Sequence, residues 1–150
     1  MPNLKNKEEE KMRDLKELGD QLAEDEGFRS KPYKCTEGVW TFGHGFTWIT
    51  EEESLVLLRG GTLKGRAYEL EQRVSDAFDW YDEMPPKIKD VVLNMCFNLG
   101  IRGFSKFKKA IQNMKDRKWE ASADEMLDSL WARQVGNRAK RLANIVREHG

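Results

Sequence analysis

The chain has 150 residues, with 26 basic and 26 acidic side chains, a hydrophobic fraction of 39% and five tryptophans. This length suits one domain, or two small lobes that share a core, and the aromatic content at zero net charge excludes a disordered chain. Zero net charge also removes the global positive field that collects phosphates, so we expect no nucleic-acid partner. The charge is unevenly spread, because residues 101–150 hold twelve basic and six acidic side chains.

The sequence has no stretch of about 20 apolar residues, the length needed to cross a bilayer. Its first eleven residues are charged where a signal peptide would be hydrophobic. We therefore expect a protein made in the cytoplasm, without a signal peptide and without stable membrane insertion. Two cysteines, Cys35 and Cys96, are too few for a disulfide framework.

Between residues 7 and 26, four apolar residues recur every three or four positions among charges, which predicts an amphipathic helix. These residues are Met12, Leu15, Leu18 and Leu22. Gly27 is suited to end this helix. The segment 28–48 is rich in aromatic and β-branched residues and is interrupted by glycines. It predicts a small antiparallel sheet with turns at 36–38 and 43–45.

Helices are expected over the rest of the chain. Thr50 and Glu53 have the spacing of a capping box, which marks a helix start. Gly60 and Gly61 interrupt that helix, and the apolar spacing predicts a second helix over residues 62–81.

Pro85 and Pro86 stand where a third helix begins. Residues 88–99 are apolar on nearly all sides, which predicts a central buried helix that ends at Gly100 and Gly103. Three further helical stretches are expected, at 105–114, 119–131 and 137–149. The fold class predicted from this order is α+β, mostly α.

One short stretch combines three reactive groups. A carboxyl at a helix end, Glu26, is followed by the thiol of Cys35 and the hydroxyl of Thr41, with a turn-rich sheet between them. Each residue alone is ordinary, and only the combination indicates a site. The thiol and the imidazole of His44 also allow a second interpretation, a cysteine hydrolase dyad that cuts a peptide or amide bond. The histidines and cysteines lack metal-ligand spacing, so we expect no metal and no cofactor.

The spacing of Glu26, Cys35 and Thr41 is similar to the Glu-x8-Asp/Cys-x5-Thr signature of T-even phage-type lysozymes, endolysins of glycoside hydrolase family 24 that cut peptidoglycan. The flanking Glu-Gly-Phe-Arg, Tyr-Lys-Cys-Thr-Glu-Gly and Thr-Phe-Gly also resemble that family. Further along, residues 94–100 resemble its central helix, and Trp131 with the Asn-Arg-Ala-Lys-Arg segment resembles its carboxy-terminal part. The resemblance covers residues 12 to 147.

The resemblance implies a two-lobed, lysozyme-like fold. Residues 1–11 form a charged extension, and residues 12–150 form the catalytic domain. Within that domain we expect a small sheet lobe over 27–49 and a helical lobe over 50–150, on which the helix at 12–26 packs. The substrate is expected in the cleft between the lobes.

The resemblance also implies the catalytic roles. Cleavage of a glycosidic bond needs an acid for the leaving oxygen and a second group that attacks the sugar or directs a water to it. Glu26 is the expected acid. Cys35, which stands where many family members have Asp, acts as a thiolate that is either base or nucleophile. Thr41 is expected to hold the attacking water, with net inversion at the sugar carbon.

Supporting residues come from later segments. Arg138 matches the arginine that pairs with the catalytic glutamate, and Asn98 and Trp131 lie in matching segments. Thr47 and Phe97 match positions that line the sugar cleft of the family.

The sequence departs from the family after Thr41. The family commonly reads Gly-x-Gly-His there, whereas here His44 lies between the glycines and Phe46 occupies the usual histidine position. A buried histidine ion pair known from some relatives is therefore not expected. The sheet also joins the next helix through residues 47–49 alone, which makes the small lobe shorter.

These expectations describe a monomeric endolysin muramidase that hydrolyses the β-1,4 bond between N-acetylmuramic acid and N-acetylglucosamine in peptidoglycan and causes host cell lysis. It would be made in the host cytoplasm and would reach the wall through a holin-type export partner. Three alternatives stay open: a lytic transglycosylase on the same substrate, the thiol amidase, and an inactive wall-binding protein.

Overall fold

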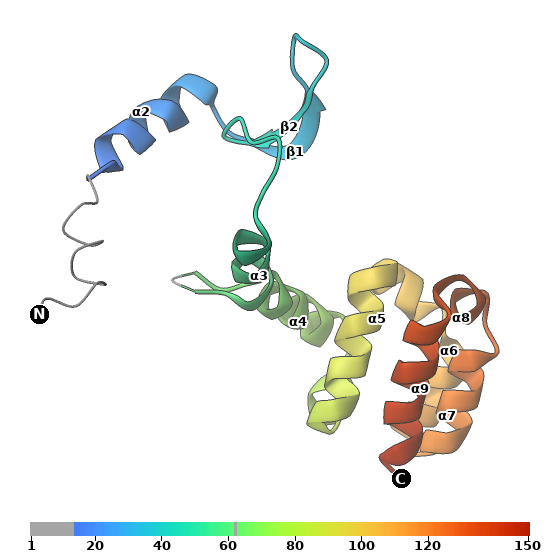
Figure 1. Ribbon diagram of the computed structural model, residues 1–150. Coiled ribbons are helices and arrows are strands. Elements are labelled where there is room, and N and C mark those ends of the chain that lie inside the picture. The colour runs from blue at the N-terminus through green and yellow to red at the C-terminus, as the bar shows by residue number, and fades with distance from the viewer. Residues whose placement is uncertain (1–13, 62) are drawn as a thin grey trace, which may run out of the picture. The chain divides into compact units, whose positions relative to one another are not determined.

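The computed structural model describes residues 14–61 and 63–150 (Figure 1). The chain divides into two compact units at the boundary between Glu53 and Ser54, and each unit is described by itself. The predicted extension over residues 1–11 lies outside the described residues.

The first unit contains helix α2 and a two-stranded antiparallel sheet. Helix α2 (Lys16–Glu26) is followed by Gly27, whose φ of 66° is a left-handed value and whose N–H donates to Ala23 O at 3.0 Å. Strands β1 (Arg29–Lys34) and β2 (Trp40–Gly43) then pair. The predicted helix end and the predicted sheet are confirmed.

Two tight turns shape this sheet. The N–H of Cys35 donates to Val39 O at 2.9 Å, which closes the turn over residues 36–38. Phe42 and Phe46 exchange two backbone hydrogen bonds, of 2.8 and 2.9 Å, which close the turn over residues 43–45. Both predicted turns are confirmed.

Helix α3 (Glu51–Arg59) begins with the predicted capping box. Glu53 N–H donates to Thr50 Oγ1 at 3.1 Å, and Thr50 N–H donates to Glu53 Oε2 at 2.7 Å. This exchange satisfies backbone donors that the first helical turn leaves unpaired.

Helix α4 (Arg66–Ala77) is shorter at both ends than the sequence predicted. Before it, the backbone forms an antiparallel bridge between Gly60 and Lys64, so neither residue belongs to the helix. After it, Phe78 is extended and a short 3-10 helix, η1 (Tyr81–Glu83), follows.

Helix α5 (Pro86–Ser105) begins at the predicted proline. It breaks at Gly100, where φ is 75° and ψ is 160°, but resumes beyond that residue, so the predicted end is a kink. The prediction that this helix is buried on nearly all sides is wrong at Phe97, which is 59% exposed. The buried side of the helix is formed by Ile88, Val91, Val92, Met95 and Cys96.

Four helices complete the second unit: α6 (Lys108–Lys115), α7 (Trp119–Leu127), α8 (Leu130–Val135) and α9 (Asn137–Glu148). Helix α7 packs against both α6 and α9, and α5 contacts α4 and α9 (Figure 1).

The single helix predicted over 119–131 is wrong, because Ser129 interrupts it. The Ser129 hydroxyl accepts from Ala132 N–H at 3.1 Å and so starts a new helix. The predicted class, α+β and mostly α, is confirmed. Among the described helices, none has the length and apolar character that a membrane crossing requires.

Candidate active site

The Glu26 side chain lies at the last residue of α2 and is exposed. Its carboxyl group contacts the second turn of the sheet, at Gly45: a Cβ atom on that glycine would lie 2.7 Å from Glu26 Oε2. The structure therefore brings the predicted acid against the turn over residues 43–45. The sequence indicated Gly45 only as a turn residue and contains no signal for this contact.

Cys35 and Thr41 are brought together by the pairing of β1 with β2. Thr41 lies opposite Tyr33, two residues before the cysteine. The backbone N–H groups of Val39 and Glu37, in that order, hydrogen bond to the sulfur and lower the pKa of the Cys35 thiol, against a smaller opposing effect of burial. The turn thus favours a thiolate.

The Thr41 side chain is buried, with 6% of its surface exposed. Its hydroxyl donates to Val39 O at 3.1 Å. Because a hydroxyl has one proton and two lone pairs, the oxygen keeps the capacity to accept a hydrogen bond from water.

His44 and Thr47 lie in and after the second turn, and both are exposed. The His44 ring lies 5.3 Å from the Phe28 ring, measured between centroids. The groups that lower the pKa of Cys35 most are backbone N–H groups of its own turn. A dyad of Cys35 with His44 stays a prediction.

In the second unit, Arg138 of α9 reaches α5. Its Nε donates to Asn94 Oδ1 at 2.9 Å, and its Nη2 donates to Asn94 O at 3.2 Å. The guanidinium is thus held in one orientation while other N–H donors stay available. The predicted pairing of Arg138 with Glu26 joins the two separately described units, and it stays a prediction.

Arg138 and the exposed Phe97 line one cavity of about 350 Å³. Asn94 is a residue of this site that the sequence analysis did not select, although a polar residue in an otherwise apolar helix is a usable signal. The cavity is lined by Leu58, Ala67, Leu70, Asp90, Leu93, Asn94, Phe97 and Arg138.

Trp131 and Asn98 also meet. The indole Nε1 donates to Asn98 Oδ1 at 2.8 Å, and only 4% of the tryptophan surface is exposed. The ring of Phe107 meets the indole edge-on, with centroids 5.8 Å apart. Trp131 therefore fixes the junction between α5 and α8.

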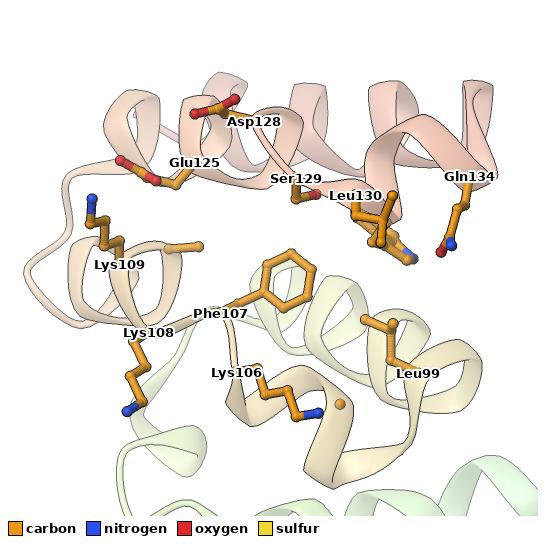
Figure 2. Close-up of a pocket in the computed structure, with 13 residues that line it drawn as sticks. Leu99, Lys106, Phe107, Lys108, Lys109, Glu125, Asp128, Ser129, Leu130 and Gln134 are labelled. Atoms are coloured by element: carbon orange, nitrogen blue, oxygen red, sulfur yellow. The ribbon is translucent and has the colours of Figure 1, made fainter.

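A larger groove of about 600 Å³ runs beside this junction (Figure 2). Phe107 and Leu99 project into it between two walls that carry charged side chains. Lysines line the wall from the end of α5 and the start of α6, and carboxylates come from α7 and its end. The charged lining residues are Lys106, Lys108, Lys109, Glu125 and Asp128.

Residues 23–148 match the sequence model of the family described as "Phage lysozyme". The chain belongs to the phage lysozyme family. It is 28% identical over 157 residues to "Probable T4-type lysozyme 2" of Dictyostelium discoideum, a match that covers 85% of this chain and 92% of that protein. It is 25% identical over 158 residues to "Probable T4-type lysozyme 1" of the same organism, covering 86% and 92%.

This membership decides the class of activity. The protein is a lysozyme-type peptidoglycan hydrolase, a glycoside hydrolase of the phage lysozyme family. The first unit supplies an exposed carboxyl group, a thiol whose pKa is lowered and a buried hydroxyl. An acid and a base with a bound water are the groups that glycoside hydrolysis needs.

Proposed function

We propose that this phage lysozyme family member is a muramidase that hydrolyses the β-1,4 bond between N-acetylmuramic acid and N-acetylglucosamine. The observation that carries this proposal is the Cys35 turn, whose backbone N–H groups favour a thiolate beside the Thr41 hydroxyl. A base in this position, in the same unit as the Glu26 carboxyl, suits attack by water.

In the proposed reaction, the Glu26 carboxyl donates its proton to the glycosidic oxygen as the bond from that oxygen to the sugar C1 breaks. Thr41 Oγ1 accepts a hydrogen bond from the attacking water, and the Cys35 thiolate takes a proton from it. The water oxygen bonds to C1 on the face opposite the leaving group, so the configuration inverts. Return of the proton from the thiol to the glutamate restores the enzyme.

We propose that Arg138 pairs with Glu26 and fixes the orientation of its carboxyl group. Two hydrogen bonds from Arg138 to Asn94 support this role, because they hold the guanidinium before any partner arrives. The pairing accords with a domain over 12–150 in which the helix at 12–26 packs on a helical lobe over 50–150 and a sheet lobe spans 27–49.

Substrate contacts are proposed for Thr47 and Phe97 with the sugars, and for the groove beside Trp131 with the peptide stem. The exposed ring of Phe97 supports the first, because sugar faces stack on aromatic rings. The groove combines an apolar floor with lysines and carboxylates, which suits a peptide that carries free charged groups.

The cellular role belongs to the same proposal. A monomer made in the host cytoplasm, with no cofactor, would act on the wall beyond the inner membrane and cause host lysis. A separate holin-type partner would let it through.

Digestion of purified peptidoglycan, with mass analysis of the products, tests the proposal. Wild type and His44→Ala are expected to release muropeptides with reducing ends, and Glu26→Gln is expected to release none. Anhydro sugars would show a lytic transglycosylase instead. Cut stem peptides that depend on His44 would show the thiol amidase, and binding without any release would show a wall-binding protein.

A further inference from the structure

Gly45 is the residue on which the Glu26 carboxyl rests. A Cβ atom at position 45 would lie 2.7 Å from Glu26 Oε2, 2.8 Å from Cδ and 3.1 Å from Cγ. Carbon atoms in contact are ordinarily about 3.5–4.0 Å apart. The carboxyl therefore occupies the space that any side chain at position 45 would need.

The backbone at Gly45 is held in place. The two hydrogen bonds exchanged by Phe42 and Phe46 close the turn on both sides of it. Its φ of 76° is a left-handed value that glycine adopts freely. By contrast, the end of the Glu26 side chain is exposed at the terminus of α2 and has free torsions. A side chain added at position 45 is therefore expected to displace the Glu26 carboxyl group and to leave the backbone of the turn in place.

We propose that Gly45 is a positioning residue for the catalytic acid: the absence of a side chain at this point of the turn sets the location of the Glu26 carboxyl. The proposal rests on the proposed function only in naming Glu26 as the acid. It predicts that a side chain at position 45 impairs catalysis by displacing the carboxyl, with no greater effect on folding than an alanine at another left-handed glycine of the chain.

Gly100 supplies the matched control, because it lies outside the turns that hold Glu26 and Cys35. Its φ is 75°, close to that of Gly45, yet a Cβ atom there would meet no atom within 4 Å. Gly100→Ala and Gly45→Ala therefore impose a similar backbone penalty, and only Gly45→Ala meets the carboxyl. The two variants are expected to show similar falls in Tm. Gly45→Ala should lower kcat about 100-fold at unchanged KM, since a displacement of about 1 Å costs a factor of that order, whereas Gly100→Ala should keep the wild-type kcat.

A second measurement does not depend on activity. The ¹³Cδ resonance of Glu26, assigned by its loss in Glu26→Gln, is expected to shift in Gly45→Ala and to stay unchanged in Gly100→Ala. An unchanged resonance, or equal kcat values for the two alanine variants, would overturn the proposal. A wild type that does not cut peptidoglycan would refute the proposed function alone, because the resonance still tests the contact. If Gly45→Ala does not fold, Gly45→Asn repeats the test, since asparagine tolerates left-handed φ better.

Discussion

Replacing Arg138 with alanine tests the link between the two halves of the proposed site. The guanidinium is half-buried and donates to Asn94 Oδ1 and to Asn94 O. Hydrogen bonds from a charged group contribute about 1.5–3 kcal/mol each, and exposure to solvent reduces that value. We expect Arg138→Ala to lower the free energy of unfolding by about 2 kcal/mol, which corresponds to a fall in Tm of about 4–8 °C for a chain of this size.

The effect on activity is expected to be larger than this stability loss explains. If Arg138 orients the Glu26 carboxyl, its removal costs about 100-fold in kcat, the order of effect that follows from loss of catalytic alignment. Asn94→Ala is the control, because it removes the hydrogen bond to Oδ1 but keeps the backbone acceptor and the guanidinium. This control should lose part of the stability and keep most of the activity.

Thermal unfolding followed by circular dichroism measures the loss of stability. The fall in turbidity of a peptidoglycan suspension, at a temperature well below the Tm of both variants, measures the activity. The reasoning is refuted if Arg138→Ala hydrolyses peptidoglycan at the wild-type rate. It is also refuted if Asn94→Ala loses as much activity as Arg138→Ala, because the arginine would then act only through α5.

Three further predictions concern the thiols and one glycine. Cys35 should react with iodoacetamide at a lower pH than a free thiol, because its lowered pKa keeps the thiolate populated as pH falls. Burial raises the pKa of Cys96 to about 12, so Cys96 should react only after unfolding. Peptide mass mapping measures the labelling, and equal labelling of the two thiols in the folded protein would contradict both statements. Cys35→Asp should keep peptidoglycan hydrolysis and Cys35→Ser should lose most of it, because a carboxylate is ionised at neutral pH and a hydroxyl is not. Equal rates of peptidoglycan hydrolysis for the two variants would exclude a base at this position. Gly65→Ala should destabilise the protein by about 1–3 kcal/mol, because its Cβ would collide with the backbone of Gly60. Gly61→Ala is the control, since its Cβ would meet only an ordinary contact at 3.6 Å. Urea denaturation compares the unfolding midpoints of the two variants, and equal midpoints would contradict the prediction.

Local chemistry made much of the fold predictable. The capping box at Thr50 and Glu53, the left-handed Gly27 and the two turns of the sheet each depend on residues within a few positions of one another. The start of α4 was misplaced because apolar spacing continues through Leu63, whereas a backbone bridge between Gly60 and Lys64 keeps these residues out of the helix. Such a bridge depends on backbone conformation, which the spacing of apolar residues does not record.

The same division holds for the site. Glu26, Cys35 and Thr41 could be selected from the sequence, because the residues of a signature keep their order and spacing in the chain. Asn94 and Gly45 were missed because their importance comes from contacts with residues far away in sequence, Arg138 and Glu26. Apolar periodicity alone assigned Phe97 to the core of a hydrophobic helix, whereas the family resemblance placed it at the sugar cleft and the structure exposes it.

The Cys35 turn supports the proposal that a thiol and a carboxylate can serve at one position of a lysozyme signature. The donors that favour the anion are the backbone N–H groups of Val39 and Glu37, which any sequence with this turn geometry provides. A backbone donor stabilises negative charge on sulfur or oxygen alike, so the turn specifies an anion and leaves its chemical identity open. The proposed role as base requires a group that is an anion at neutral pH, and among short side chains aspartate is already ionised there. A cysteine thiol ordinarily has a higher pKa, which the turn lowers, so the geometry of residues 35–39 is expected to matter more for a cysteine at this position than for an aspartate.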